Sequence, residues 1–109
     1  MKNNHLLKVA GFGVDFSYDV VKIDNVLVRE TICTITDLSN EYVITVARVG
    51  CHSGDIFSKS TGRKKSLARA LTSPILQERW GRGYHGFKKA LWQAYFTRSG
   101  KTPQEAKYQ

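Results

Sequence analysis

The stretch VVKIDNVLVRETICTIT, residues 20–36, decides the fold class of this 109-residue chain. Its β-branched residues predict two strands, at residues 20–23 and 26–36. Asp24 and Asn25 lie between them, and both residue types tolerate the backbone angles of a tight two-residue turn. We therefore expect an antiparallel hairpin, and with it a sheet built from the first half of the chain.

Two further segments extend this expected sheet. Residues 42–49 read YVITVARV, a nearly continuous apolar run that is typical of a central strand buried on both faces. Residues 7–16 are less regular, because Gly11 and Gly13 weaken a strand and indicate a bulge or a bend. The first half therefore predicts three or four antiparallel strands.

After Gly50 the pattern becomes helical. Residues 55–71 predict a helix, in which Asp55 or Ser53 accepts hydrogen bonds from the free amides of the first turn. Gly62 within this helix costs about 1 kcal/mol relative to Ala, which indicates a close approach of the backbone to the sheet or to a ligand. Of these two alternatives, we expect the backbone at Gly62 to approach the sheet. The stripe expected to face it consists of Phe57, Thr61, Leu67, Ala68, Ala70 and Leu71.

Two more helices are expected beyond this one. Ser73 and Pro74 begin a short helix over residues 75–80, since Pro suits the first helical position. A glycine-rich break follows, and a final helix over residues 87–98 ends before Gly100. Its apolar residues are Phe87, Leu91, Ala94 and Tyr95 on one face, with Trp92 and Phe96 on the next. Exposure of Trp92 or Phe96 would favour a homodimer.

The whole chain is expected to form a single α+β domain. An antiparallel sheet of three to four strands from the N-terminal half packs against two to three helices from the C-terminal half. Residues 1–100 make up this domain, and residues 101–109 form a polar, frayed tail. Apolar residues at 41% and charged residues at 24% are ordinary for a globular chain and exclude a disordered composition.

The positive charge lies almost entirely in the second half. Residues 51–109 hold twelve Lys and Arg against three acids, whereas residues 1–50 hold five against six. Such a basic surface collects anions, which predicts nucleic acid or the acidic surface of a protein complex as partner. The expected phosphate-binding residues are Lys59, Arg63, Lys64, Lys65, Arg69, Arg79 and Arg82. The alternative is a solvated basic surface that only keeps the protein soluble.

The segment RWGRGYHG, residues 79–86, mixes arginine, glycine and rings without any acid. Nucleic-acid binders use such mixtures, in which guanidinium groups meet phosphates and rings stack on bases. Trp80 and Tyr84 are the expected stacking residues. In the alternative interpretation, the segment is an interhelical loop whose two rings insert into the core, and the sequence leaves both open.

The sequence favours a binding protein without catalysis, metal or cofactor. Cys33, Cys51, His52 and His85 lack the paired spacing of zinc ligands, and the acids of the first half lack the clustering that a metal-dependent nuclease needs. Adjacent residues such as Cys51 and His52 point apart on an extended chain, so they do not form a nucleophile and its base. The two cysteines are expected to be free thiols.

Neither membrane insertion nor export is indicated. The longest apolar runs are a few residues, and residues 1–7 lack the apolar stretch of a secretion signal. We therefore expect the protein in the cytoplasm.

Residues 46–71 carry a resemblance to small, mostly uncharacterised bacteriophage accessory proteins. In those proteins a strand ending near a Cys leads to Asp-x-Phe-x-Lys-x-x-Gly-Arg and then Ala-Leu-x-Arg-Ala-Leu. The matching residues are Asp55, Phe57, Lys59, Gly62, Arg63, Leu67, Arg69, Ala70 and Leu71. The resemblance covers about a quarter of the chain. It implies a phage protein in the host cytoplasm that acts against host defences or redirects host nucleic-acid machinery.

Four functions stay open on these grounds, and one of them is an undetected nuclease. The leading hypothesis is binding to nucleic acid, or to a host defence or replication complex loaded with nucleic acid, through the basic helical face. A second is an inhibitor that docks on a host defence protein without touching nucleic acid. A third is sequestration of a small signalling nucleotide near Arg63 and His85.

Overall fold

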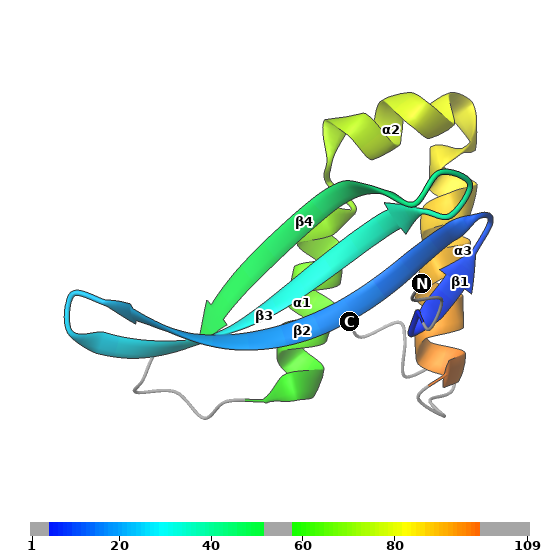
Figure 1. Ribbon diagram of the computed structural model, residues 1–109. Helices are drawn as coiled ribbons and strands as arrows, with labels where there is room; N and C mark the ends of the chain where they lie inside the picture. Colours follow the sequence, from blue (N-terminus) through cyan, green and yellow to red (C-terminus); the bar gives the residue numbers. More distant parts are fainter. Residues whose placement is uncertain (1–4, 52–57, 99–109) are drawn as a thin grey trace.

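The computed structural model describes residues 5–51 and 58–98. Its four strands are β1 (Leu7–Val9), β2 (Phe12–Ile23), β3 (Val26–Asp37) and β4 (Tyr42–Cys51). They form one sheet in the order β1-β2-β3-β4, and every neighbouring pair is antiparallel. Each strand therefore pairs with the strand next to it in the chain, as Figure 1 shows.

The expected turns between strands are confirmed. Asp24 and Asn25 adopt φ values of 51° and 65°, the left-handed conformation that a two-residue hairpin turn requires. The bend near the start of the sheet lies at Ala10 and Gly11, with φ values of 50° and 84°. Gly13 instead lies inside β2. Because β4 ends opposite Arg29, the tip of the β2–β3 hairpin extends past it, at the left of Figure 1.

The expectation that residues 42–49 form a central strand is wrong. β4 lies at the edge of the sheet, and Tyr42, Val43 and Val46 are 70%, 55% and 51% exposed. Only its inward side is covered, where Ala47 is buried. An apolar run predicts that a segment forms a strand. Whether that strand has one neighbouring strand or two depends on how the other strands pair.

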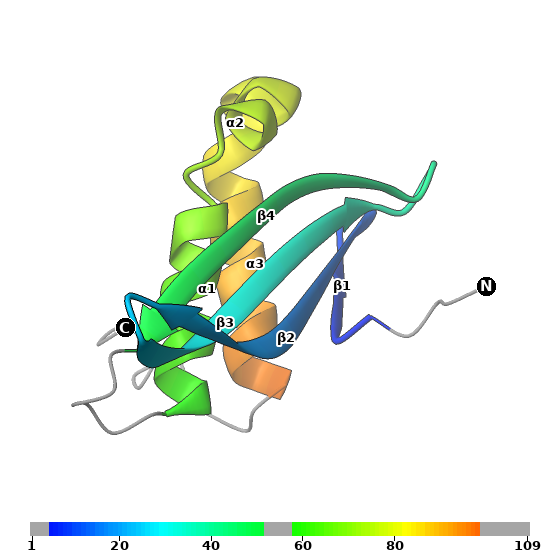
Figure 2. The same cartoon turned by 60° about the vertical axis from the view of Figure 1, so that its left-hand side comes forward.

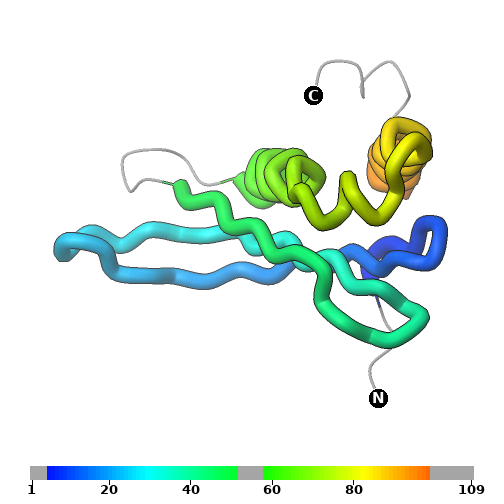
Figure 3. Tube along the Cα trace, turned by 90° about the horizontal axis from the view of Figure 1, so that it is seen from above, coloured from blue at the N-terminus to red at the C-terminus, as the bar shows by residue number. Residues whose placement is uncertain are grey.

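The second half forms α1 (Lys59–Ala70), α2 (Pro74–Trp80), a 3₁₀ turn η1 (Gly81–Gly83) and α3 (Tyr84–Arg98). α1 packs on β3 and β4, α3 packs beside β1, and α2 joins the two. α1 and α3 lie side by side and run in opposite directions on the same face of the sheet (Figures 2 and 3). The predicted α+β architecture, with helices over one face, is confirmed.

Two helix starts differ from the sequence expectation. α1 begins at Lys59, and the Ser58 side chain caps it by accepting a hydrogen bond from the Thr61 amide at 3.2 Å. The expected caps at Ser53 and Asp55 and the anchor at Phe57 lie outside the described residues. α3 begins at Tyr84 instead of residue 87, because η1 leads directly into it. The start of α2 at Pro74 is confirmed.

The stripe of α1 that faces the sheet is rotated from the expected one. Leu67, Ala70 and Leu71 are buried as expected, but Thr61 and Ala68 are exposed. The sheet is met instead by a row of small residues spaced four apart, namely Gly62, Ser66 and Ala70. Small side chains allow the helix axis to lie close to the strands.

Gly62 is the point of closest approach. A Cβ atom at this position would overlap the Oγ1 of Thr31 on β3 and lie 3.0 Å from the Thr31 Cβ. The expectation that Gly62 permits close packing on the sheet is confirmed. The Thr31 hydroxyl is buried and has no hydrogen-bond partner among the described residues. The Cα hydrogen of Gly62 points at it, and such C–H···O contacts are weakly favourable.

The core lies between the sheet and α1 and α3. It contains Val14 and Ile35 from the sheet and Leu67, Leu91 and Tyr95 from the helices. Tyr95 is 1% exposed, and its ring meets that of Phe16 edge-on at 6.0 Å between centroids. Phe96 is also buried in this core, so it does not supply the exposed surface on which a homodimer was expected.

The structure joins neither Cys33 nor Cys51 in a disulfide, so both are thiols, as expected. Cys33 on β3 lies opposite Ala47 on β4. Cys51 lies four residues beyond Ala47 along β4, and these four residues span about 13 Å at about 3.3 Å per residue. That separation is too great for a disulfide. Burial, helped by the charge of Asp15, raises the pKa of Cys33 to about 12, so this thiol stays protonated near neutral pH.

Replacing Gly62 by Ala is expected to destabilise the protein by up to about 2 kcal/mol. Overpacking costs about 1–3 kcal/mol, and Ala recovers about 1 kcal/mol of helix propensity. In a Thr31→Ala background the same substitution is expected to be less destabilising, because the overlapping hydroxyl is gone and only the contact with the Cβ of residue 31, at 3.0 Å, remains. Urea unfolding of the four proteins of this double-mutant cycle measures the coupling.

Gly86 provides the control. It lies within α3, and a Cβ there meets nothing within 4 Å. Gly86→Ala should stabilise the protein by up to about 1 kcal/mol through helix propensity alone. Equal effects of the Gly62 and Gly86 substitutions would contradict the close contact between α1 and β3.

Candidate nucleic-acid interface

The basic residues expected to bind phosphates separate into several environments. Five lie on α1, at Lys59, Arg63, Lys64, Lys65 and Arg69. Arg79 lies on α2 and Arg82 on η1. Two hollows beside α1 and one groove between α1 and α3 are lined by four members of the set, and Lys65 lines both one hollow and the groove.

The groove between α1 and α3 is lined by more Lys and Arg residues than either hollow is. It has a volume of about 610 Å³ and is lined by Thr61, Lys64, Lys65, Ala68, Thr72, Lys88 and Trp92. Three of these residues are lysines and none is acidic. We call this feature the α1–α3 groove.

Helical spacing explains how the α1–α3 groove is built. Thr61, Lys65 and Ala68 follow one another at four- and three-residue intervals, so they form one ridge of α1, and Thr72 continues this ridge just past the end of the helix. The same rotation of α1 that brings Gly62 to the sheet turns this ridge away from it.

The other wall of the groove comes from α3. Lys88 and Trp92 are four residues apart and share a face of that helix. Trp92 is half-buried, and its ring stacks on Phe96 at 5.7 Å between centroids. The groove therefore combines lysines with an aromatic ring held in place by the core.

Arg63 points elsewhere, into a hollow beside β2. Its Nε donates a hydrogen bond to the Tyr95 hydroxyl at 3.2 Å, and its Nη1 donates to the Tyr18 hydroxyl at 3.1 Å. Partial burial lowers the pKa of Arg63, but the hydrogen bonds and the charge interactions with the two tyrosines together outweigh it, and the net shift is upward. His85 lies ten residues before Tyr95 on α3, about 15 Å along the helix, and does not line this hollow.

Lys59 and Arg69 make separate contacts at the two ends of α1. The Lys59 ammonium lies 4.8 Å from the centre of the Tyr18 ring, which is a cation–π geometry. Arg69 donates from Nη1 to the backbone carbonyl of Arg48 at 2.9 Å, which ties α1 to β4. Arg69 also shares a hollow of about 430 Å³ with Lys65, next to Val49 of β4.

Arg79 is engaged within the protein. Its Nη2 forms an ion pair with the buried carboxylate of Asp37, and its guanidinium lies 5.8 Å from the centre of the Phe12 ring. Ser39 donates to the same carboxylate from its hydroxyl at 2.7 Å and from its amide at 2.9 Å. The bonds from Ser39, assisted by Arg79, hold the pKa of Asp37 below its usual value.

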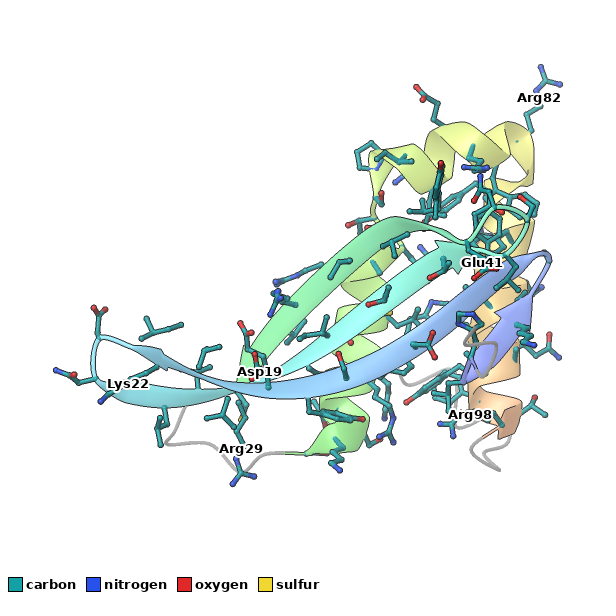
Figure 4. The ribbon with its side chains drawn as sticks, viewed as in Figure 1. Asp19, Lys22, Arg29, Glu41, Arg82 and Arg98 are labelled. Atoms are coloured by element: carbon teal, nitrogen blue, oxygen red, sulfur yellow. The ribbon has the colours of Figure 1, made fainter. Side chains whose placement is uncertain are left out.

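The glycine-rich segment is divided between surface and core. Arg82 is exposed at the end of the molecule opposite Arg98, as Figure 4 shows. Trp80 is half-buried and stacks on Phe87 at 4.6 Å between centroids. Tyr84 also packs against the core, and burial raises its pKa. Both rings thus lie where the core-packing alternative places them.

The candidate groove includes two residues that the sequence analysis did not select, Lys88 and Trp92. Their spacing on a predicted helix placed them on one face, and this was the only signal. Nothing in the sequence said that this face would lie opposite Lys64 and Lys65. That pairing depends on how α1 and α3 pack.

The structure describes only some of the residues that the sequence analysis considered for catalysis and metal binding. His52 and Ser53 lie outside the described residues. Among residues 5–51 and 58–98, no three His, Cys, Asp or Glu side chains gather as metal ligands would. No helix in the same ranges has the length and apolar character that crossing a membrane requires.

Comparisons with protein-family models, with curated proteins and with solved structures yield no match. We therefore infer function from the residues at the surface of the protein.

Asp37→Asn is expected to destabilise the protein at neutral pH and to flatten its response to acid. Because the folded pKa of Asp37 lies below its unfolded value near 3.9, its contribution is complete above about pH 5 and is lost as the pH falls through the folded pKa. Chemical unfolding from pH 6 to pH 2 measures this. An Asp19→Asn control removes an exposed carboxylate and should leave the acid response intact. Identical pH profiles for wild type and Asp37→Asn would contradict the role of Asp37.

Proposed function

We propose that this protein is a non-catalytic binder of single-stranded nucleic acid, and that the α1–α3 groove holds the strand. The observation that carries the proposal is the convergence of Lys64, Lys65 and Lys88 with Trp92 around one groove that contains no acid. Lysines contact phosphates without regard to sequence, and an aromatic ring offers a stacking surface to any base.

The dimensions of the groove support a strand of a few nucleotides. The wall that begins on α1 extends from Thr61 to Thr72, just past the end of the helix, about 16 Å at about 1.5 Å per residue. At the duplex spacing of about 3.4 Å per nucleotide this length corresponds to roughly five nucleotides, and an extended single strand places fewer along it. Ala68 and the two threonines are small, so the backbone of a strand can approach α1 closely while the longer lysines reach its phosphates.

A single strand suits this groove better than a duplex does. Stacking on Trp92 requires a base that is free of its neighbours, which a single strand supplies at no unpairing cost. The bases of a duplex are already stacked on one another.

In biological terms we propose a phage-type accessory protein in the host cytoplasm. Its partner is free nucleic acid or a host defence or replication complex that carries exposed single strands. The resemblance of residues 46–71 to phage proteins and the basic charge of the second half are the grounds for this part of the proposal.

The second candidate function is an inhibitor that binds a host protein directly. It is favoured by the projecting tip of the β2–β3 hairpin, where Val20, Ile23, Val26 and Leu27 are 41–61% exposed. Exposed apolar patches mark protein-binding surfaces. A host complex that survives nuclease treatment and is lost on Leu27→Asp would support this function over the first.

The triple substitution Lys64→Gln, Lys65→Gln and Lys88→Gln tests the groove. For wild type, three phosphate contacts on a single strand predict a slope of log affinity against log salt of about −2, or a roughly 20-fold loss between 50 and 200 mM salt. The triple variant should bind weakly at low salt and lose most of this dependence. Fluorescence anisotropy with a labelled oligonucleotide measures both.

The matched control removes the same charge elsewhere. Lys8, Lys22 and Lys89 are exposed and do not line the groove, so their combined change to Gln alters the net charge equally. This control should keep the wild-type affinity and slope. Equal losses in the two triple variants would mean that total charge matters and the groove does not, which would leave the basic surface as an aid to solubility.

Trp92 is expected to report binding directly. In a Trp80→Phe variant Trp92 is the remaining tryptophan, and its fluorescence should be quenched as an oligonucleotide binds. Trp92→Ala should weaken binding by about 1–3 kcal/mol, the value of one stacked base. Circular dichroism checks that each variant is folded. Unchanged Trp92 fluorescence at saturating oligonucleotide would place the strand elsewhere.

A further inference from the structure

A second positively charged feature lies where the end of α3 meets β2 and the residues before β1. It is a hollow of about 550 Å³, lined by His5, Leu6, Asp15, Phe16, Tyr18, Arg63 and Arg98. It shares no lining residue with the α1–α3 groove. We call it the Arg63–Arg98 hollow.

One tyrosine brings the two arginines together. The hydroxyl of Tyr95 accepts the hydrogen bond from Arg63 Nε at 3.2 Å, and the Arg98 guanidinium lies 5.3 Å from the centre of the Tyr95 ring. Tyr95 is 1% exposed, so the core holds it rigidly. The two guanidinium groups thus reach the same hollow from different helices, although they repel one another.

The acid in the hollow does not neutralise these arginines. The Asp15 carboxylate is bound to His5 Nδ1 at 2.5 Å and accepts a second hydrogen bond from the Leu6 amide at 3.1 Å. In the part of the chain that the structure describes, neither Arg63 nor Arg98 lies within ion-pair distance of a carboxylate. Two like charges therefore face one partly enclosed space, in which the one lining carboxylate, Asp15, is hydrogen-bonded to His5 and Leu6 and forms no ion pair with either arginine.

Hydrogen bonds also orient Arg63 in advance. Its Nε and Nη1 are held by two tyrosine hydroxyls, whereas the guanidinium group carries five N–H donors in a planar fork. Donors remain for an incoming ligand, and little side-chain entropy is lost when it binds. Leu6, Phe16 and Tyr18 add apolar and aromatic walls beside these donors.

We propose that the Arg63–Arg98 hollow binds a phosphate monoester, the group carried by a nucleoside monophosphate or by the phosphorylated end of a nucleic-acid strand. A monoester is close to a dianion at neutral pH, which balances two guanidinium groups, whereas a carboxylate neutralises one. The volume of the hollow lies within the range of small-ligand sites and leaves room for a nucleoside against the aromatic walls.

Isothermal titration calorimetry of the full chain tests the proposal with three probes: a nucleoside 5′-monophosphate, the uncharged nucleoside and inorganic phosphate. The monophosphate should bind at least tenfold more tightly than the nucleoside, and inorganic phosphate should compete with it. Arg98→Gln should weaken monophosphate binding at least tenfold. Arg98 is exposed, so this variant should fold. Lys89→Gln, which removes a charge from the same helix outside the hollow, should bind as wild type.

Two further measurements complete the test. Tyr18→Phe removes one hydroxyl that orients Arg63 but no charge, and it should weaken binding by less than Arg98→Gln does. An oligonucleotide with a 5′-phosphate is compared with its 5′-hydroxyl form as competitor. Competition by the phosphorylated form alone assigns the ligand to strand ends, and competition by neither assigns it to free nucleotides; both results support the site.

Two results would overturn the proposal. The first is equal affinity of wild type and Arg98→Gln for the monophosphate, and the second is no binding of any monophosphate at millimolar concentration. The Lys64, Lys65 and Lys88 triple variant should retain monophosphate binding. The failure of this site can thus be told apart from the failure of the α1–α3 groove.

Discussion

The contact between Gly62 and Thr31 governs the arrangement of the helical layer. With no Cβ at residue 62, α1 lies directly on β3, and Ser66 and Ala70 continue the same close seam. This contact sets both the height and the rotation of α1. The direction in which each basic side chain of α1 points follows from that rotation, because every residue of the helix lies at a fixed angle from Gly62. A bulkier residue at position 62 would move α1 away from the sheet. The basic residues that α1 contributes to the α1–α3 groove and to the Arg63–Arg98 hollow would move with it.

Tyr95 has the corresponding role on α3. Its ring packs in the core against Phe16, and its hydroxyl reaches across to Arg63 on α1. The aromatic cluster of α3 therefore divides the space between the helices. On the solvent side Trp92 and Lys88 line the α1–α3 groove, whereas on the sheet side Arg63 turns toward β2. Two anion-attracting surfaces with different chemistry result, one suited to a polymer backbone and one to a terminal phosphate.

The excess charge of the second half thus has several roles. Arg79 neutralises Asp37 and helps to hold α2 against the sheet, and Arg69 joins α1 to β4. These two cations serve the fold, whereas Lys64 and Lys65 line the α1–α3 groove. Net charge predicts that a polyanion will be attracted. It does not identify the cations that meet it, since that depends on which of them find partners inside the protein.

The sequence by itself determined the local features. Asp24 and Asn25 specified the hairpin and Pro74 the start of α2, because each depends on backbone preferences within a few residues. Gly62 indicated a close approach, and the structure identified Thr31 as its partner. Only the tertiary structure decided that β4 lies at an edge, that Thr61 and Ala68 face away from the sheet, and that Trp80 and Tyr84 pack inward. It alone placed Lys88 opposite Lys64 and Arg98 beside Arg63. Such pairings join residues distant in the chain, and the packing of whole elements, which no short pattern encodes, brings them together.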